Sequence, residues 1–297
     1  MPAITTKEYH KCCGGEVRRA TFTSQTLGGE AAFSLFLPKQ ALAGRNVPVI
    51  YVLAGLTCTE ETFLIKANAV RHAAQHGLAL VCSDTSPRGA GVPTITDEWD
   101  IGPGAGYYVN ATAAPWQARY RMWDFVRSEL PTTVENAFPL DGARRGVMGH
   151  SMGGMGALAL ALREPGLYQS ASMFAPICNP SAVPWGEKAT QLYFGGDSHL
   201  WDAYDPCRLL ASGHEFPGGF LVDQGLDDPF LKSQLHPDAL ENAARKAGQA
   251  LKLRRHEGYD HSYWFVQSFI AEHIRHHAEQ LNHTQVNHTQ APRETTP

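Results

Sequence analysis

The stretch that decides the fold is RRGVMGHSMGGMGALALALRE, residues 144–164. A β-rich run, RRGVM, leads directly into GHSMGG at 149–154, and an Ala/Leu helix pattern follows over 155–163. A serine at a tight strand-to-helix turn needs small neighbours, because its strained backbone forms only where the adjacent chain approaches closely. Such a turn points the Ser151 hydroxyl away from the sheet and leaves the first N–H groups of the helix free to face negative charge. The sequence therefore predicts Ser151 as a nucleophile, with a purely structural glycine turn as the alternative.

Strand-like and helix-like segments alternate on both sides of this turn. Buried-strand patterns occur at 49–55, 78–84, 170–175, 219–225 and 250–258, and helix patterns at 62–75, 237–247 and 262–280. This alternation predicts parallel strands joined by helical crossovers, with helices on both faces of one sheet. Two β-rich runs near the start, at 17–24 and 31–37, predict an antiparallel hairpin around a Gly-Gly turn. The loop-rich segments 84–120 and 176–216 are expected to hold substrate at the carboxyl ends of the strands.

Composition indicates one soluble globular domain. The chain has 297 residues, of which 43% are apolar and 18% charged, which is the profile of a folded α/β protein. We expect a single domain over residues 1–281. Residues 282–297, NHTQVNHTQAPRETTP, contain almost nothing apolar and predict a disordered tail.

Charge and hydropathy exclude several classes of function. The formal net charge is −4 and there is no long basic run, so we expect no nucleic-acid partner. No uncharged apolar stretch approaches the roughly 18 residues of a membrane span, and the start lacks a secretory signal, so we expect no membrane partner and a cytoplasmic location. Six cysteines are too few for a disulfide scaffold. Cys12 and Cys13 have no partner pair at zinc-ligand spacing, so no metal site is predicted.

A serine nucleophile needs a histidine base. The chain has 14 histidines, and position discriminates among them. His261 lies in GYDHS, residues 258–262, in the loop between the last strand and the last helix, from which an imidazole can reach across the end of the sheet. His150 adjoins Ser151, but we expect the turn to point it elsewhere. His256 falls within the strand pattern at 250–258. The closing helix carries three further histidines, which we expect to face solvent: His273, His276 and His277.

The acid that orients the imidazole is expected after the strand 219–225. Asp223 still belongs to that strand, whereas Asp227 and Asp228 lie in the turn that follows. The residues alone leave Asp227 and Asp228 as equal alternatives.

Two backbone N–H groups are predicted to bind the oxyanion. One is Met152 N–H, at the start of the helix. The other comes from the loop Ala54–Thr59 after the central strand, where Gly55 permits close approach of the backbone and Leu56 N–H completes the pocket.

The sequence resembles the S-formylglutathione hydrolase family, also called esterase D, of the α/β-hydrolase superfamily, over residues 5–280. Eight blocks in one order carry the resemblance: GLTCTEETF at 55–63, KANAVRHAAQHGLALVCSDTSPRG at 66–89, GAGYYVNAT at 104–112, YRMWDFVRSELP at 120–131, GHSMGG at 149–154, PWGEKA at 184–189, DQGLDDPFL at 223–231 and GYDHSYWF at 258–265. The implied fold is α/β, a mostly parallel central sheet with an N-terminal antiparallel hairpin and helices on both faces.

Matched block by block, the resemblance implies Ser151 as nucleophile, His261 as base and Asp228, rather than Asp227, as acid. It implies hydrolysis of the small-molecule thioester S-formylglutathione to glutathione and formate, in formaldehyde detoxification, without a cofactor and with a homodimer as the assembly. Two alternatives stay open. One is a general small-acyl carboxylesterase or acyltransferase on the same scaffold, and the other is a binding protein that keeps the fold without catalysis.

The sequence departs from the family pattern at two positions. Met155 stands where the family usually has histidine, and Thr190 where it has an aromatic residue, so we expect an altered acyl pocket with intact chemistry. Trp185 is predicted either to form a wall of that pocket or to be a core residue. Cys58 adjoins the oxyanion loop without a histidine of its own, so it is not a predicted nucleophile, but a bulky adduct on its thiol would obstruct the site.

Overall fold

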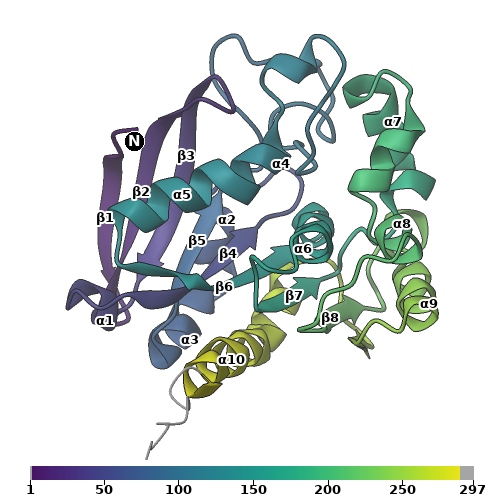
Figure 1. Ribbon diagram of the computed structural model, residues 1–297. Coiled ribbons are helices and arrows are strands. Elements are labelled where there is room, and N and C mark those ends of the chain that lie inside the picture. The colour runs from purple at the N-terminus through teal and green to yellow at the C-terminus, as the bar shows by residue number, and fades with distance from the viewer. Residues whose placement is uncertain (1, 288–297) are drawn as a thin grey trace, which may run out of the picture.

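Nine strands form a single mixed sheet in the part of the chain that the structure describes (Figure 1). The computed structural model describes residues 2–287, with side chains through residue 282. The spatial order is β1-β2-β3-β5-β4-β6-β7-β8-β9; the first three strands and the β3–β5 pair are antiparallel, and the remaining pairs are parallel. The strands are β1 Thr5–Cys12, β2 Gly15–Ser24, β3 Gly29–Leu37, β4 Val47–Leu53, β5 Ala79–Ser83, β6 Leu140–His150, β7 Ser170–Phe174, β8 Phe220–Gly225 and β9 Leu251–His256.

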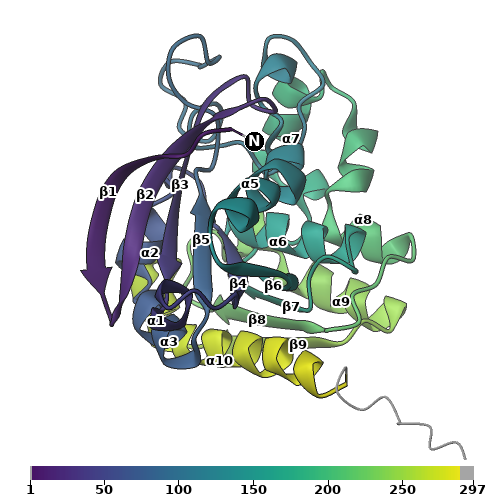
Figure 2. The ribbon, with the colours of Figure 1, turned by 60° about the vertical axis from the view of Figure 1, so that its left-hand side comes forward.

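Helices cover both faces of the parallel half of the sheet (Figure 2). Helix α6 packs on β4, β6 and β7, and α10 packs on β6, β7 and β8 together with α3 on the opposite face. Because both faces are covered, every residue of β4 is buried and its sequence is continuously apolar. The predicted α/β fold is thereby confirmed. The helices are α1 Lys39–Leu42, α2 Thr62–Lys66, α3 Ala69–His76, α4 Met122–Asp124, α5 Leu130–Ala137, α6 Met152–Arg163, α7 Pro184–Tyr193, α8 Pro206–Ala211, α9 Pro237–Ala247 and α10 Tyr263–Asn287.

The N-terminal edge adds a strand that the sequence did not indicate. The predicted hairpin is confirmed as β2 and β3, which pair from Glu16↔Leu37 to Ser24↔Gly29. Strand β1 extends it by one more antiparallel strand. Seven of its eight residues are exposed, so β1 has no alternation of apolar and polar residues, which is the pattern that predicts a half-buried strand.

Two helices differ from the prediction. The pattern at 62–75 is interrupted at Asn68, whose φ of 56° separates α2 from α3. The closing helix α10 extends through Asn287, so residues 282–287 of the predicted tail are helical, while residues 288–297 lie outside the described residues. None of the described helices is long and apolar enough to cross a bilayer.

The prediction that the histidines of the closing helix face solvent is wrong for two of them. His273 and His277 are fully buried beneath the sheet. His277 Nδ1 lies 2.6 Å from Ser170 Oγ, and its Nε2 lies 2.8 Å from Ser172 Oγ, so β7 provides hydrogen-bond partners for both ring nitrogens. A polar residue on a helix pattern does not by itself reveal such a partner on a distant strand.

The loops at the carboxyl ends of the parallel strands are densely packed. Residues 84–121 form the loops at the top of Figure 1, between β5 and α4. Tyr107, Tyr108, Trp116 and Tyr120 from this segment are buried. These aromatic side chains give the segment a core of its own, so it forms a fixed wall over the edge of the sheet where the predicted site lies.

Candidate active site

Ser151 occupies a strained turn between β6 and α6. Its backbone has φ 58° and ψ −120°, a region that costs a non-glycine residue about 1–3 kcal/mol. A Cβ on Gly149 would lie 2.0 Å from the Gly153 carbonyl oxygen, and one on Gly153 would lie 2.0 Å from the Leu53 carbonyl oxygen. Neither glycine can therefore be replaced without moving the backbone, as the predicted nucleophile turn requires.

The structure brings Asp228 and His261 together. His261 Nδ1 lies 2.5 Å from Asp228 Oδ2. The carboxylate is buried and also accepts hydrogen bonds from Phe230 N–H at 2.8 Å and from Gln224 Nε2 at 3.2 Å. Asp227, the alternative that the residues alone left open, is exposed. Sequence reasoning did not single out Gln224 or Phe230, although both lie in the DQGLDDPFL block.

His150 connects the turn to the imidazole. Its ring is buried, with its centroid 4.7 Å from that of His261 and 5.4 Å from that of Tyr263. Burial and the neighbouring His261 hold the pKa of His150 well below its usual value, so it is neutral at physiological pH. We expected the turn to point His150 elsewhere. The His150 ring instead packs on His261. Because His150 directly precedes Ser151, this contact brings His261 close to the serine turn.

The two predicted oxyanion donors are free. Loop Ala54–Thr59 approaches Ser151 so closely that a Cβ on Gly55 would lie 3.1 Å from Ser151 Cβ. Within the loop, Thr57 N–H donates to the Gly104 carbonyl and Cys58 N–H to the Gly55 carbonyl. Leu56 N–H and Met152 N–H have no acceptor among the described residues. Two unused donors near the serine are what the stabilisation of a negative oxygen requires.

Cys58 is a half-buried thiol in the same loop. Its Sγ lies 3.9 Å from Tyr263 Oη, and burial raises the pKa of the thiol. The Cys58 carbonyl accepts hydrogen bonds from Thr85 Oγ1 at 2.6 Å and from Arg88 Nη2 at 2.9 Å. The residue therefore braces the oxyanion loop through its backbone, and its side chain remains a thiol rather than a thiolate at neutral pH.

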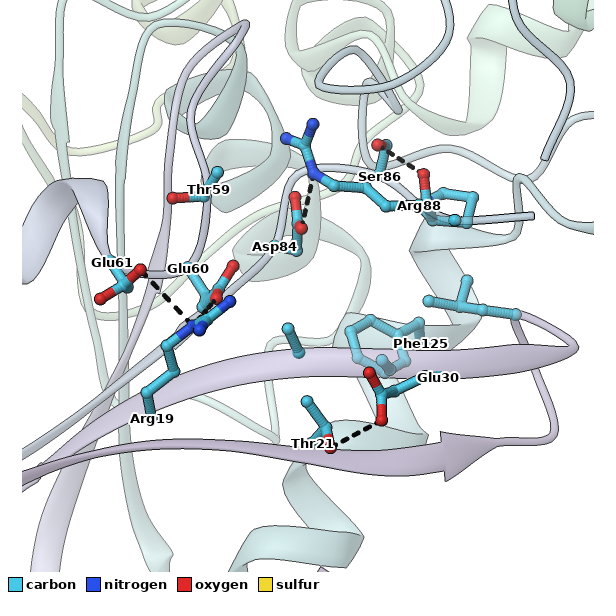
Figure 3. A pocket seen from close by; sticks show the side chains of 15 residues that line it. Arg19, Thr21, Glu30, Thr59, Glu60, Glu61, Asp84, Ser86, Arg88 and Phe125 are labelled. Atoms are coloured by element: carbon cyan, nitrogen blue, oxygen red, sulfur yellow. Dashed lines mark hydrogen bonds and ion pairs between the residues drawn. The ribbon is translucent and has the colours of Figure 1, made fainter. Parts of the chain in front are cut away.

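A pocket of about 300 Å³ lies beyond the same loop and contains none of the predicted catalytic residues (Figure 3). Its charged side chains face one another: Arg19 Nε lies 2.6 Å from Glu60 Oε1, and Arg88 Nε lies 2.7 Å from Asp84 Oδ2. Because Arg88 also holds the Cys58 carbonyl, this pocket contains the ion pair that fixes the loop.

Aromatic rings extend from His261 toward solvent. Phe230 packs edge-on against His261 at 5.0 Å, Trp185 lies 5.0 Å from Phe230, and Trp99 lies 5.7 Å from Trp185. Trp185 is 6% exposed and Trp99 52% exposed. Trp185 is thus one ring removed from the imidazole, so it is both a buried residue and a neighbour of the site.

The two departures from the family pattern are buried. Met155 is on α6, four residues after Ser151, and is 1% exposed. Thr190 is on α7, where its hydroxyl accepts a hydrogen bond from Trp201 Nε1 at 2.7 Å and donates one to the Gly186 carbonyl at 2.8 Å. Among the described residues, neither Met155 nor Thr190 forms a hydrogen bond with His261 or Asp228.

The chain is similar in sequence and fold to known esterases. The family model described as a putative esterase matches residues 24–276. An S-formylglutathione hydrolase from Mus musculus is 46% identical over 274 residues, covering 92% of this chain and 97% of the relative. A solved S-formylglutathione hydrolase from Agrobacterium tumefaciens superimposes with a TM-score of 0.91 at 40% identity, covering 93% of this chain and 99% of that one. A fluorophosphonate-binding serine hydrolase from Staphylococcus aureus, with TM-score 0.70 and 20% identity over 89% of this chain and 98% of its own, shares the fold. The chain belongs to the S-formylglutathione hydrolase family of esterases.

Proposed function

We propose that this protein is a serine thioesterase that hydrolyses S-formylglutathione to glutathione and formate and so acts in formaldehyde detoxification. The 46% identity to a relative of that name supports the substrate. The observation that carries the chemistry is the buried Asp228 carboxylate 2.5 Å from His261 Nδ1, beside a strained serine turn.

Acylation begins at Ser151. With Nδ1–H donating to Asp228, the other ring nitrogen of His261, Nε2, is the unprotonated one and takes the proton from the Ser151 hydroxyl as its oxygen attacks the formyl carbonyl. The carbonyl oxygen becomes an oxyanion held by Leu56 N–H and Met152 N–H. When the intermediate collapses, the carbon–sulfur bond breaks and glutathione thiolate leaves, taking the proton from His261.

Deacylation repeats these steps with water. His261 removes a proton from a water molecule, which attacks the formyl ester of Ser151, and formate leaves as the serine recovers its proton. Asp228 stays ionised throughout and stabilises the imidazolium. Each oxyanion donor lowers the barrier by about 3 kcal/mol.

The proposal extends to the surroundings of the triad. It includes an acyl pocket between Cys58 and Trp185, a single catalytic domain over residues 1–281, a cytoplasmic location and a homodimer. The aromatic rings of Phe230 and Trp185 next to His261 support an apolar acyl pocket, which would exclude water from the intermediate.

Substrate comparison tests the proposal. We expect kcat/KM for S-formylglutathione to exceed that for aryl acetates and aryl butyrates at matched conditions. Similar values for all three would support the alternative of a general small-acyl carboxylesterase. Stoichiometric labelling of Ser151 by a fluorophosphonate, found by peptide mapping, tests the nucleophile, and a protein that is labelled nowhere would be a non-catalytic binding protein.

A further inference from the structure

Two adjacent cysteines lie at the tip of the first hairpin, remote from the proposed active site. Cys12 ends β1, Gly15 begins β2, and Cys13 and Gly14 form the two-residue turn between them. Five strand-to-strand steps separate β1 from β6, which carries the serine turn, and at about 4.8 Å each they amount to roughly 24 Å. Figure 2 shows this turn at the lower edge of the sheet, away from α6.

The backbone of the turn brings the two sulfur atoms to the same side. In an extended strand, neighbouring side chains point to opposite faces. Here Cys13 has φ 50° and Gly14 has φ 77°, both in the left-handed region, as two-residue hairpin turns of type I′ require. The Sγ atoms of Cys12 and Cys13 consequently lie only 3.7 Å apart.

The pair is open to solvent. Cys13 is exposed and Cys12 is half-buried. A Cβ built on Gly14 would meet no atom within 4 Å, so no neighbouring element covers the turn. Of the other four cysteines, Cys82 and Cys178 are buried and Cys58 and Cys207 are half-buried. Cys13 is therefore the most accessible thiol of the described residues, and it has a second thiol in contact with it.

The spacing matches a centre bound by two thiolates. A trivalent pyramidal centre has a bond angle smaller than the tetrahedral one, so two sulfur ligands on it lie slightly closer together than the 3.7 Å observed between Cys12 Sγ and Cys13 Sγ. A small rotation of the exposed Cys13 side chain closes that difference. No group of three or more His, Cys, Asp or Glu side chains able to hold a metal occurs among the described residues. A structural zinc site needs four protein ligands. Two thiols instead suit a metalloid centre that bonds to two protein sulfurs and keeps one non-protein substituent.

We propose that Cys12 and Cys13 form a vicinal dithiol site that binds trivalent arsenicals. With phenylarsine oxide, the arsenic–oxygen double bond breaks and two arsenic–sulfur bonds form. Each thiol gives its proton to the departing oxygen, which leaves as water, and the phenyl group remains on arsenic. Arsenic stays trivalent, so no oxidant or reductant takes part.

Intact-mass measurement of the purified chain with phenylarsine oxide tests the site. We expect one adduct per chain, which persists in excess glutathione, a monothiol, and is removed by dithiothreitol, a dithiol. Cys12→Ser and Cys13→Ser should each weaken binding about 100-fold, because the second bond is then lost from an effectively intramolecular step. Cys207→Ser, which alters a half-buried cysteine elsewhere, should bind like the wild type.

Two results would overturn the site. One is wild-type binding no tighter than that of Cys13→Ser, and the other is an adduct that peptide mapping places on cysteines other than this pair. Because Cys13 is exposed and lies in a solvent-facing turn, its serine variant should keep the wild-type circular dichroism spectrum. Ester hydrolysis, measured in the same samples, should be unchanged by Cys13→Ser, so the test is independent of the proposed function.

Discussion

Two aspartates five positions apart on and after β8 each face a histidine, and they differ in what else surrounds them. In the buried cluster, Asp223 accepts two hydrogen bonds of 2.6 Å from Arg254 and lies 3.3 Å from His273 Nε2, and neither Asp223 nor His273 is exposed. In the edge pair, Asp228 meets His261 alone among the charged groups of the described residues, and the His261 side chain is 15% exposed.

The difference shows how one pair of residue types serves two purposes. Burial raises the pKa of Asp223, but the neighbouring His273 and the hydrogen bonds from Arg254 outweigh it and hold the pKa at about 2. The charge of Asp223 is therefore balanced by the Arg254 guanidinium. Burial lowers the pKa of His273, whose ring has no access to solvent. At the edge pair no guanidinium competes, so Asp228 remains available to stabilise a protonated His261.

The largest expected effect is the loss of catalysis when the proposed nucleophile or base is removed. Ser151→Ala and His261→Ala should each lower kcat for S-formylglutathione by about 10⁶, because the hydroxyl and its base act as one unit. Their thermal unfolding midpoints should stay near that of the wild type. Steady-state kinetics and circular dichroism check both statements, and near-wild-type turnover in either variant would remove that residue from the mechanism.

The next largest effect is a difference in kcat between variants of the two neighbouring carboxylates that follow β8. Asp228→Asn should lower kcat by about 10⁴, because an amide favours the wrong imidazole tautomer. Asp227→Asn is the matched control, with the same chemical change at an exposed residue one position earlier, and should stay within a few-fold of wild type. The reverse ranking would move the role of the acid to Asp227.

The third effect is on stability and belongs to the buried cluster. Asp223→Asn should lower the free energy of unfolding by about 3–5 kcal/mol, because Arg254 loses its buried partner. Urea unfolding measures the loss. We expect kcat of the folded variant to stay within a few-fold of wild type, and the double variant Asp223→Asn with Arg254→Met to regain part of the stability. A loss of kcat comparable to that of Asp228→Asn would erase the distinction between the two sites.

The smallest effect is the pH dependence of that stability difference. The pKa of Asp223 is lowered in the folded state to about 2 from the ordinary 3.8, so its stabilisation is fully present above about pH 4 and is lost as the pH falls toward 2. The shift corresponds to about 2 kcal/mol. Urea unfolding of wild type and Asp223→Asn between pH 6 and pH 3 should show the gap narrowing at the acid end. If the difference in free energy of unfolding between wild type and Asp223→Asn did not change with pH, packing rather than charge would account for the stabilisation.

The sequence predicted most of the central sheet because its strands are buried on both faces and read as continuous apolar runs. Val47–Leu53 and the turn around Ser151 are examples in which local pattern and final structure agree. It did not predict β1, whose residues are almost all exposed, or the burial of His273 and His277. Strand β1 forms through backbone hydrogen bonds to the adjacent β2 rather than through burial, so it lacks a hydrophobic pattern. The two buried histidines depend on partners that are distant in the chain, namely Asp223, Ser170 and Ser172.

The chain by itself determined the alternation of strands and helices, the glycine-lined turn that carries Ser151 and the loops from which an acid and a base would come. These depend on backbone geometry and hydrophobic spacing, which are local. The residue pattern alone left Asp227 and Asp228 equal, the family resemblance favoured Asp228, and the tertiary structure shows Asp228 beside His261. Only the tertiary structure decided that His150 packs on that ring and that Asp223 is paired with Arg254. The physical reason is that the electrostatic environment of a buried carboxylate is set by side chains that folding brings from other strands and helices, and that no spacing along the chain encodes.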